Sequence, residues 1–162
     1  MELIRKAAPD DAGIITELLT QVEHVHHELR PDIFRGPGPH VKYERKELEA
    51  IFEDENRPIF VIERDGTVRG YAFCIIKKAS GDPVLNDAVT LYVDDLCVDE
   101  NCRRLGYGKK LFDFVSGYAR GLGCHSVTLN VWSGNEAAMR FYESVGMTPR
   151  NITMEKILEP SD

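Results

Sequence analysis

A glycine loop between a strand-like run and a helical pattern is the feature that most constrains how this chain can fold. Thr90–Val98 is rich in β-branched and apolar residues, as strands are. Gly106 and Gly108 follow, and without a Cβ they let the backbone turn tightly and approach a ligand closely. The helix expected after them has one apolar face, formed by Leu111, Val115, Tyr118 and Leu122. A strand that runs through such a loop into a helix is typical of α/β proteins.

The remaining elements follow from the spacing of the apolar residues. A helix is expected after Asp10-Asp11, which offers an N-cap, and a hairpin is expected across Asp65-Gly66. The expected order is β-α-α-β-β-β-α-β-α-β, with a second helix carried by Val41, Leu48, Ile51 and Phe52 and a last helix from Asn135 to Val145. The strands are expected at 2–7, Ile59–Glu63, Val68–Lys77, Thr90–Val98, Ser126–Trp132 and Ile152–Leu158.

This order predicts the fold class. Strands precede helices in the second half of the chain, which indicates an α/β fold with a mixed sheet and helices on both faces. No linker, repeat or low-complexity stretch interrupts the pattern. We therefore expect a single domain over residues 1–162.

Charge and hydropathy exclude several classes of partner. A formal net charge of −7 argues against nucleic acid, because a phosphate-binding surface needs clustered Lys and Arg. No stretch approaches the roughly 20 apolar residues of a membrane span. Met1–Ile15 also lacks the pattern of a signal peptide. We expect no membrane partner and a cytoplasmic location.

Cysteine and histidine are not spaced as metal ligands, so no metal is expected. His24, His26 and His27 lie close together, but no carboxylate or cysteine cluster completes a ligand set. The four cysteines form no CxxC pair and are expected to be buried reduced thiols: Cys74, Cys97, Cys102 and Cys124.

The glycine loop itself indicates a phosphorylated ligand. Arg103-Arg104 and Lys109-Lys110 bracket the two glycines. The first N–H groups of the following helix lack partners within it, and the helix dipole favours an anion there, so a pyrophosphate is the natural guest. One alternative is that the glycines only close the strand-to-helix turn. A dinucleotide site is the other, but the spacing here is RxxGxG in mid-chain rather than GxGxxG after a first strand.

A second motif begins at Asn135. Asn135 and Tyr142 are seven residues apart, two helical turns, and so lie near one face of the expected helix. Ala138 between them leaves room for a thin ligand. Taken singly, Asn135 is explained as an N-cap and Tyr142 as a core aromatic residue with a bonded hydroxyl.

Together the two motifs resemble those of the GNAT superfamily of acyl-CoA-dependent N-acetyltransferases. Arg103-x-x-Gly106-x-Gly108 is similar to the pyrophosphate loop of that family. The second motif, similar to the family's other CoA motif, is Asn135-x-x-Ala138-x-x-Phe141-Tyr142-x-x-x-Gly146. The resemblance covers nearly the whole chain in element order and about Thr90–Thr148 in motif detail. It implies a mostly antiparallel sheet whose middle strands, Thr90–Val98 and Ser126–Trp132, splay apart to admit the pantetheine arm.

The resemblance also implies where acetyl-CoA, the co-substrate, is held. Asn135 is expected on the CoA arm, and Tyr142 near the sulfur. Main-chain groups on the central strand are expected to bind the pantetheine and to polarise the acetyl carbonyl, those of Leu96, Cys97 and Val98. The pyrophosphate is expected to bind at the loop. Arg103 and the backbone amides of the loop are expected to hold it, those of Arg104, Leu105, Gly106, Tyr107, Gly108 and Lys109.

Two catalytic roles follow from the same resemblance. Tyr142, protonated at pH 7, matches a general acid for the departing thiolate. Some family members carry a glutamate at the place of Asn130, which cannot take a proton. Asp94 and Asp95 are the available carboxylates, and polyamine acetyltransferases have an acidic pair similarly placed. Asp94 is favoured as the base because it shares strand parity with Leu96 and Val98; the alternative is a carboxylate that only binds a strand edge or a helix amide.

The function expected is transfer of an acetyl group to a primary amine of a small molecule. The region His24–Arg35, at the end of the first helix, is expected to line the acceptor pocket or to form a solvated loop. A protein or peptide N-acetyltransferase and a non-catalytic CoA-binding sensor are the alternatives. A homodimer is also expected, because an apolar final strand at a sheet edge tends to be paired or covered.

Overall fold

The computed structural model describes residues 1–160, which divide into two compact units, Met1–Asn130 and the segment that begins at Val131. The single domain expected over residues 1–162 stays a prediction. No helix among the described residues has the length and apolar character to cross a bilayer.

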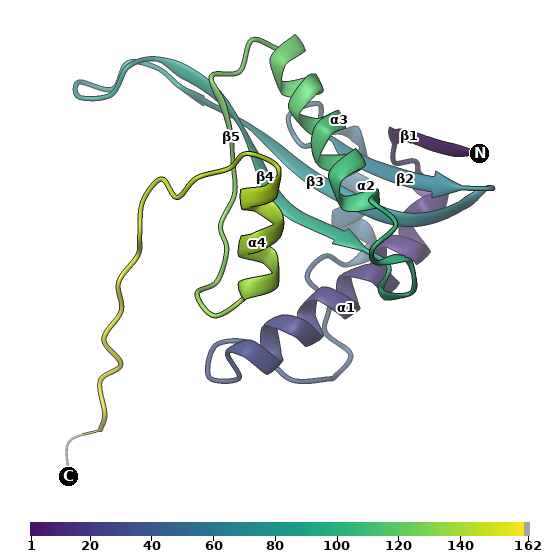
Figure 1. Ribbon diagram of the computed structural model, residues 1–162, viewed down its shortest axis with the longest axis horizontal. Helices are drawn as coiled ribbons and strands as arrows, with labels where there is room; N and C mark the ends of the chain where they lie inside the picture. Colours follow the sequence, from purple (N-terminus) through teal and green to yellow (C-terminus); the bar gives the residue numbers. More distant parts are fainter. Residues whose placement is uncertain (161–162) are drawn as a thin grey trace. The chain divides into compact units, whose positions relative to one another are not determined.

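The first unit is built on one five-stranded sheet (Figure 1). Its strands lie in chain order. Each of the first three pairs antiparallel with the next, and only β5 runs parallel to its neighbour, β4. The strands are β1 Glu2–Lys6, β2 Ile59–Arg64, β3 Thr67–Ala79, β4 Ala88–Val98 and β5 Ser126–Thr128. The prediction of a mixed, mostly antiparallel sheet is confirmed.

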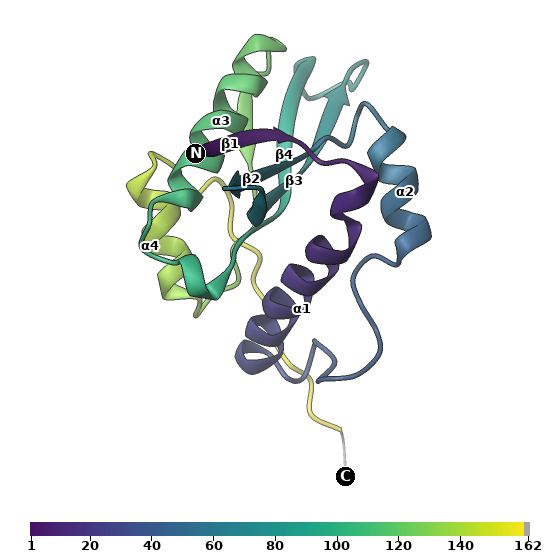
Figure 2. The same ribbon diagram turned by 90° about the vertical axis from the view of Figure 1, so that its right-hand side faces the viewer.

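Helices cover both faces of this sheet (Figure 2). The helices α1 Ala12–Leu29 and α2 Arg45–Glu53 pack on one face, against Val61, Tyr71 and Phe73. The helix α3 Tyr107–Gly121 packs on the other, where Phe60 and Ala72 form part of its core. Successive residues of a strand point to opposite faces, so neighbouring residues of β2 and β3 serve the two cores.

The hairpin between β2 and β3 forms at the predicted turn. Asp65 has φ 51° and Gly66 has φ 79°. Positive φ at both central residues is the requirement of the two-residue turn that Asp-Gly favours, because its twist matches that of the strands.

Three local expectations in the first unit are wrong. Asp11 precedes α1 without capping it, because its carboxylate instead accepts hydrogen bonds from the Arg5 guanidinium and the Ala8 amide. Leu122 lies just past the end of α3 and is 48% exposed, whereas Ala119 is buried. Val41 precedes α2, which begins only at Arg45.

The second unit contains one helix, α4 Glu136–Ser144. Asn135 caps its start and Gly146, with φ 94°, follows its end, as the sequence predicts. Asn130 closes the first unit, and β5 ends at Thr128, so the strand expected over Ser126–Trp132 is much shorter.

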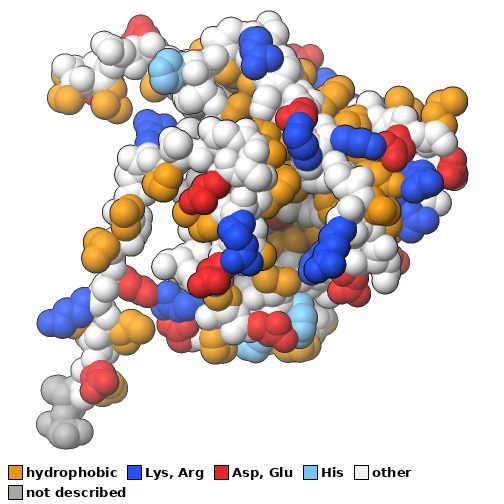
Figure 3. Space-filling model, in the orientation of Figure 1, with side chains coloured by type: hydrophobic (Ala, Val, Ile, Leu, Met, Phe, Trp, Pro, Cys, Tyr) orange, Lys and Arg blue, Asp and Glu red, His pale blue; other side chains and the backbone are white. Residues whose placement is uncertain are grey.

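The final strand expected at Ile152–Leu158 is absent, and residues 147–160 adopt no regular structure. A strand forms only where a neighbour accepts hydrogen bonds from its N–H groups and donates them to its C=O groups, and the described part of this unit contains no other strand. The segment therefore exposes its apolar side chains (Figure 3), with Ile152 77%, Met154 85%, Ile157 69% and Leu158 80% exposed.

Candidate active site

A bulge in β4 brings the two acidic residues of the central strand onto one face. Phe73 of β3 pairs with Asp95, and the next residue, Cys74, pairs with Val93, so Asp94 has no opposite residue in the register. The extra residue interrupts the alternation of side chains. Asp94 and Asp95 both contact Lys42, which precedes α2.

The strand parity expected for Asp94 is therefore wrong. Leu96 and Val98 pack in the core that contains Leu111 of α3. Asp94 instead accepts a hydrogen bond from Tyr43, whose ring packs against the core of α1 and α2. Shared parity requires an unbroken alternation of side chains along β4, and the bulge interrupts that alternation.

Each carboxylate of the pair is oriented by a tyrosine. The Tyr43 hydroxyl donates to Asp94 Oδ2 at 2.5 Å, and the Tyr71 hydroxyl donates to Asp95 Oδ2 at 3.1 Å. The Asp94 side chain is 18% exposed and that of Asp95 is 8% exposed. Lys42 Nζ lies 3.1 Å from Asp94 Oδ2 and 3.9 Å from Asp95 Oδ2. The result is a recessed acidic pair with one ammonium group upon it.

Burial changes the protonation chemistry of this group. Burial raises the pKa of Asp95 to about 6, an effect that the Lys42 charge and the Tyr71 hydroxyl oppose and the Asp94 charge increases. Burial, with the neighbouring carboxylate, also raises the pKa of the Tyr43 and Tyr71 hydroxyls, which keeps both as hydrogen-bond donors. A carboxyl group that titrates near neutral pH can both take and release a proton in the working range of an enzyme.

Beside the acidic pair, one edge of β4 is open. Pairing with β5 covers only Thr90–Tyr92, because β5 ends at Thr128, while β4 continues to Val98 paired with β3 (Figure 1). The two middle strands are thus paired at one end only, although β5 is shorter than the strand expected to splay from β4. The open stretch includes Leu96, Cys97 and Val98, whose main-chain groups are the predicted contacts of the acyl arm. Asn130, just past β5, donates its side-chain amide to Tyr92 Oη at 3.1 Å.

The glycine loop leads from β4 into α3 with the backbone that the sequence predicts. Gly106 is the N-cap of α3 and has φ 78°, a conformation that favours glycine. A Cβ added there would meet no atom within 4 Å, so the space beside it is open. The first N–H groups of α3, from Tyr107 to Lys109, have no acceptor within the helix. This open, donor-lined turn fits a pyrophosphate.

The loop's positive charge comes from fewer residues than the sequence suggests. Lys109 pairs with Asp113, and Lys110 pairs with Glu2 of β1. Arg103 and Arg104 are exposed beside the turn. The Tyr107 ring is buried and its hydroxyl accepts from Arg64, so only its amide can serve a ligand.

The two residues of the second motif lie on α4 of the second unit. Asn135 Oδ1 accepts from the Ala138 amide at 3.2 Å, so its oxygen caps the helix while its amide group can donate to a ligand. Tyr142 is half-buried and packs edge-on against Phe141, with ring centroids 5.0 Å apart. Their contacts with CoA stay predictions.

The predicted acceptor segment is folded back on the end of α1. His26 stacks on Phe34 at 4.9 Å, and His27 Nδ1 lies 2.8 Å from the Phe34 carbonyl oxygen. Burial, and secondarily the charge of Lys42, lowers the pKa of His26. Lys42 therefore lies within electrostatic reach of both this segment and the acidic pair.

Sequence reasoning missed three residues of this site: Lys42, Tyr43 and Tyr71. Tyr71 lies within the strand expected at Val68–Lys77, where nothing distinguishes it from a core residue. Lys42 and Tyr43 follow a proline-rich stretch without periodic spacing of apolar residues. Tyr71 meets Asp95 because β3 pairs with β4, and Lys42 and Tyr43 meet the acidic pair because the chain before α2 returns to the sheet. No local sequence pattern encodes either contact.

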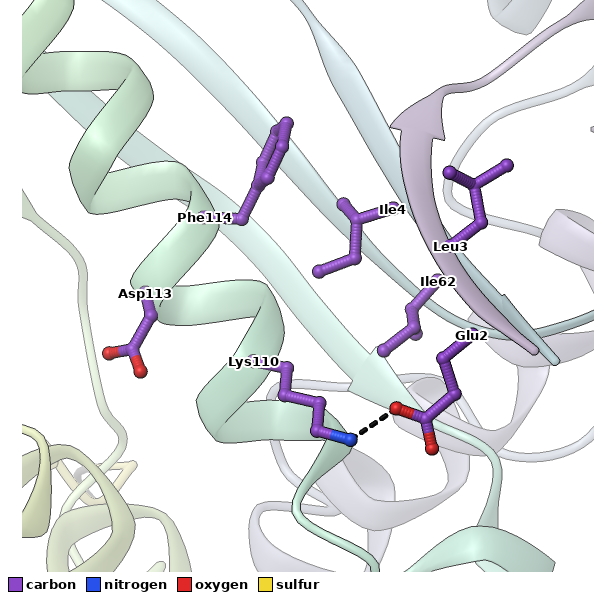
Figure 4. Close-up of a pocket in the computed structure, with 7 residues that line it drawn as sticks. All are labelled: Glu2, Leu3, Ile4, Ile62, Lys110, Asp113 and Phe114. Atoms are coloured by element: carbon purple, nitrogen blue, oxygen red, sulfur yellow. Dashed lines mark hydrogen bonds and ion pairs between the residues drawn. The ribbon is translucent and has the colours of Figure 1, made fainter.

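A separate hollow of about 480 Å³ lies between β1 and α3 (Figure 4). Leu3, Ile4, Ile62 and Phe114 provide its apolar wall, and the ion pair between Lys110 and Glu2 spans it. Its charged groups already satisfy one another, so they supply little for catalysis. The acidic pair lies on the face of α1 and α2, away from this hollow.

The described cysteines are free thiols, and no metal-binding cluster accompanies them. Cys74, Cys97 and Cys102 are buried free thiols, as predicted, and Cys124 is partly buried. Across residues 1–160, no three side chains of His, Cys, Asp or Glu are grouped so as to hold a metal ion.

Comparison with known proteins gives consistent matches. A model described as the acetyltransferase (GNAT) family matches residues 19–147. The glucosamine 6-phosphate N-acetyltransferase of Arabidopsis thaliana is 31% identical over 120 residues, 73% of this chain and 76% of that protein. The 5-NmdU N-acetyltransferase of Pseudomonas phage PaMx11 is 32% identical over 148 residues, 91% of this chain and 88% of the phage protein. The crystal structure of a tetramutant of the BH1408 protein from Bacillus halodurans has a TM-score of 0.91 at 30% identity, covering 96% of this chain and 99% of that one.

Proposed function

Because this chain belongs to the acetyltransferase (GNAT) family and is an acetyltransferase, we propose that it moves the acetyl group of acetyl-CoA directly to a primary amine of a small molecule. The observation that carries the proposal is the recessed pair Asp94–Asp95. Both residues belong to β4, in the part of the strand that β5 does not pair with. A cationic amine is the acceptor that such a pair attracts. The glucosamine 6-phosphate enzyme of Arabidopsis, a relative, is named for a small amine substrate.

The residues of the first unit are suited to hold the co-substrate, which the family generally takes as acetyl-CoA. The amides from Arg104 to Lys109 would bind the pyrophosphate at the open turn of Gly106, with Arg103 adding charge. Main-chain groups between Leu96 and Val98, on the edge of β4 that β5 leaves open, would bind the acyl arm. Acetyl-CoA supplies the activated thioester.

The side chains then divide the proton transfers. The acidic pair takes the proton that the ammonium of the acceptor must lose before its nitrogen attacks. As the new N–C bond forms, the C–S bond breaks, and Tyr142 gives its hydroxyl proton to the departing sulfur. The second proton that the nitrogen loses as the amide forms restores the Tyr142 hydroxyl. Asp95, with its raised pKa, and the more exposed Asp94 act as one unit because their charges are coupled.

A panel of acceptors assayed for released CoA tests this function. With acetyl-CoA present, small primary amines are expected to release CoA at rates well above the background, and peptides bearing free N-termini or lysines are not. Release with peptides alone would show a protein-modifying enzyme instead. CoA binding without release for any member of the panel would show a sensor and contradict the proposal.

We further propose that the protein is a homodimer. Four exposed apolar side chains lie in the segment that follows α4, those of Ile152, Met154, Ile157 and Leu158. Exposed apolar surface of this kind is characteristic of association sites. Light scattering at tens of micromolar is expected to give twice the chain mass of 18.3 kDa. A mass of one chain there would overturn the dimer, and replacing Ile152 and Met154 together with serine is expected to shift the mass toward the monomer.

A further inference from the structure

The acidic pair already holds a cation, the ammonium group of Lys42. Lys42 Nζ is 3.1 Å from Asp94 Oδ2 and 3.9 Å from Asp95 Oδ2. Both carboxylates are more deeply placed than the lysine, whose side chain is 34% exposed. The ammonium thus reaches the pair from the solvent side, which is the direction from which an acceptor must arrive.

The surroundings of this ammonium are those of an amine-binding site. Lys42 Nζ lies 5.5 Å from the centroid of the Tyr43 ring, within the range of a cation–π contact. Tyr43 stacks on Phe73, with centroids 5.2 Å apart, which gives the site an aromatic wall. The Arg57 guanidinium donates to the Tyr43 hydroxyl at 3.3 Å and so stays on the phenol rather than on the carboxylates. Lys42 is the cation in contact with both carboxylates of the pair.

The position of Lys42 in the chain allows its side chain to move away from the acidic pair. Lys42 stands in the irregular stretch between the end of α1 and Arg45, where α2 begins. A lysine ammonium on its flexible stem can swing into water at low cost, because a partly exposed ion pair contributes little net stability. When both carboxylates are ionised, a departing Lys42 leaves two negative charges that attract another ammonium.

We propose that Lys42 determines acceptor specificity as a tethered ammonium, which occupies the acceptor's place on Asp94 and Asp95 until a cationic amine displaces it. This inference rests on the proposed function, because it takes the acidic pair to be where the acceptor amine binds. A tethered competitor lowers the apparent affinity of every acceptor by the fraction of time that it fills the site. Amines that carry a full positive charge can replace it, and neutral molecules of the same shape cannot.

Binding of a simple probe tests the inference without turnover. Butylammonium chloride is titrated at pH 8 while the backbone amide signals of Asp94 to Leu96 are followed by NMR, with butanol as the neutral isostere. Lys42→Met removes the charge and keeps much of the stem, so the butylammonium dissociation constant is expected to fall about fivefold. Lys42→Arg retains a cation and is expected to behave like the parent. Lys46→Met, at an exposed position on α2, is the matched control and is expected to change nothing.

The outcomes separate this inference from the proposed function. Equal butylammonium affinity in the parent and Lys42→Met, or equal binding of butanol, overturns the role of Lys42 whatever the enzyme assay shows. Failure of every amine in the CoA-release panel overturns the small-amine function instead. If Lys42→Met loses the dispersed spectrum of a folded protein, Lys42→Gln provides the same measurement with a polar neutral side chain.

Discussion

Replacing Gly106 with valine is expected to abolish binding of CoA and acetyl-CoA while the fold persists. Gly106 has φ +78°, a conformation that a β-branched residue adopts only under strain of about 1–3 kcal/mol. The first turn of α3 must then shift, and its amides no longer converge on the pyrophosphate. The valine side chain also enters the open space beside the turn, where no protein atom lies within 4 Å.

Thermal unfolding with and without CoA measures this loss. At a hundredfold excess over its dissociation constant, CoA is expected to stabilise the parent by about 2.7 kcal/mol, and Gly106→Val is expected to lose this stabilisation. Gly66→Val is the matched control, because Gly66 has φ +79° with equally open space but lies in the β2–β3 hairpin. It is expected to lower the melting temperature without reducing the shift that CoA produces. A full CoA shift in Gly106→Val would refute the loop assignment.

Tyr142→Phe is expected to reduce turnover by roughly 10²–10⁴-fold, the usual contribution of a placed general acid. The lower end is expected, since the thiolate of CoA is itself a fair leaving group. Removing one oxygen keeps the ring against Phe141, so the melting temperature and CoA affinity should change little. The loss should appear equally in kcat and kcat/KM, because the proton transfer belongs to the transition state.

Asp94→Asn provides the contrast that separates acid from base. An enzyme without its base is expected to recover activity at high pH, where more of the acceptor amine is already neutral, whereas Tyr142→Phe is not. Both rates are measured by CoA release across pH 6–10 with the best acceptor of the panel. Full activity in Tyr142→Phe would reduce that tyrosine to a packing residue.

Features encoded by neighbouring residues could be predicted from the sequence. The hairpin at Asp65-Gly66, the loop at Gly106 and the capped start of α4 each depend on the conformational preferences of one or two residues. The apolar spacing that predicted α1 and α3 is likewise local. The ends of elements were less accurate, as Leu122 shows, because the last turn of a helix depends on what it packs against.

The C-terminal segment shows the opposite case. Ile152–Leu158 has the composition of a strand but adopts no regular structure. Strand composition describes a side-chain preference, while a strand exists only where another chain segment pairs with its backbone. The sequence of the segment by itself contains no information about that neighbour.

The sequence by itself determined the family motifs, the α/β order and the backbone of the phosphate-binding turn, since these depend on contacts between residues close in the chain. Only the tertiary structure decided the chemistry of the acceptor side. The bulge that turns Asp94 and Asp95 to one face arises from the register of β4 against β3. The raised pKa of Asp95 arises from burial beneath distant segments, and Lys42 reaches it from 53 positions earlier in the numbering. Register and burial depend on contacts between distant parts of the chain. The sequence therefore shows that a carboxylate is present, but the pKa of that carboxylate and its ion-pair partner depend on the tertiary structure.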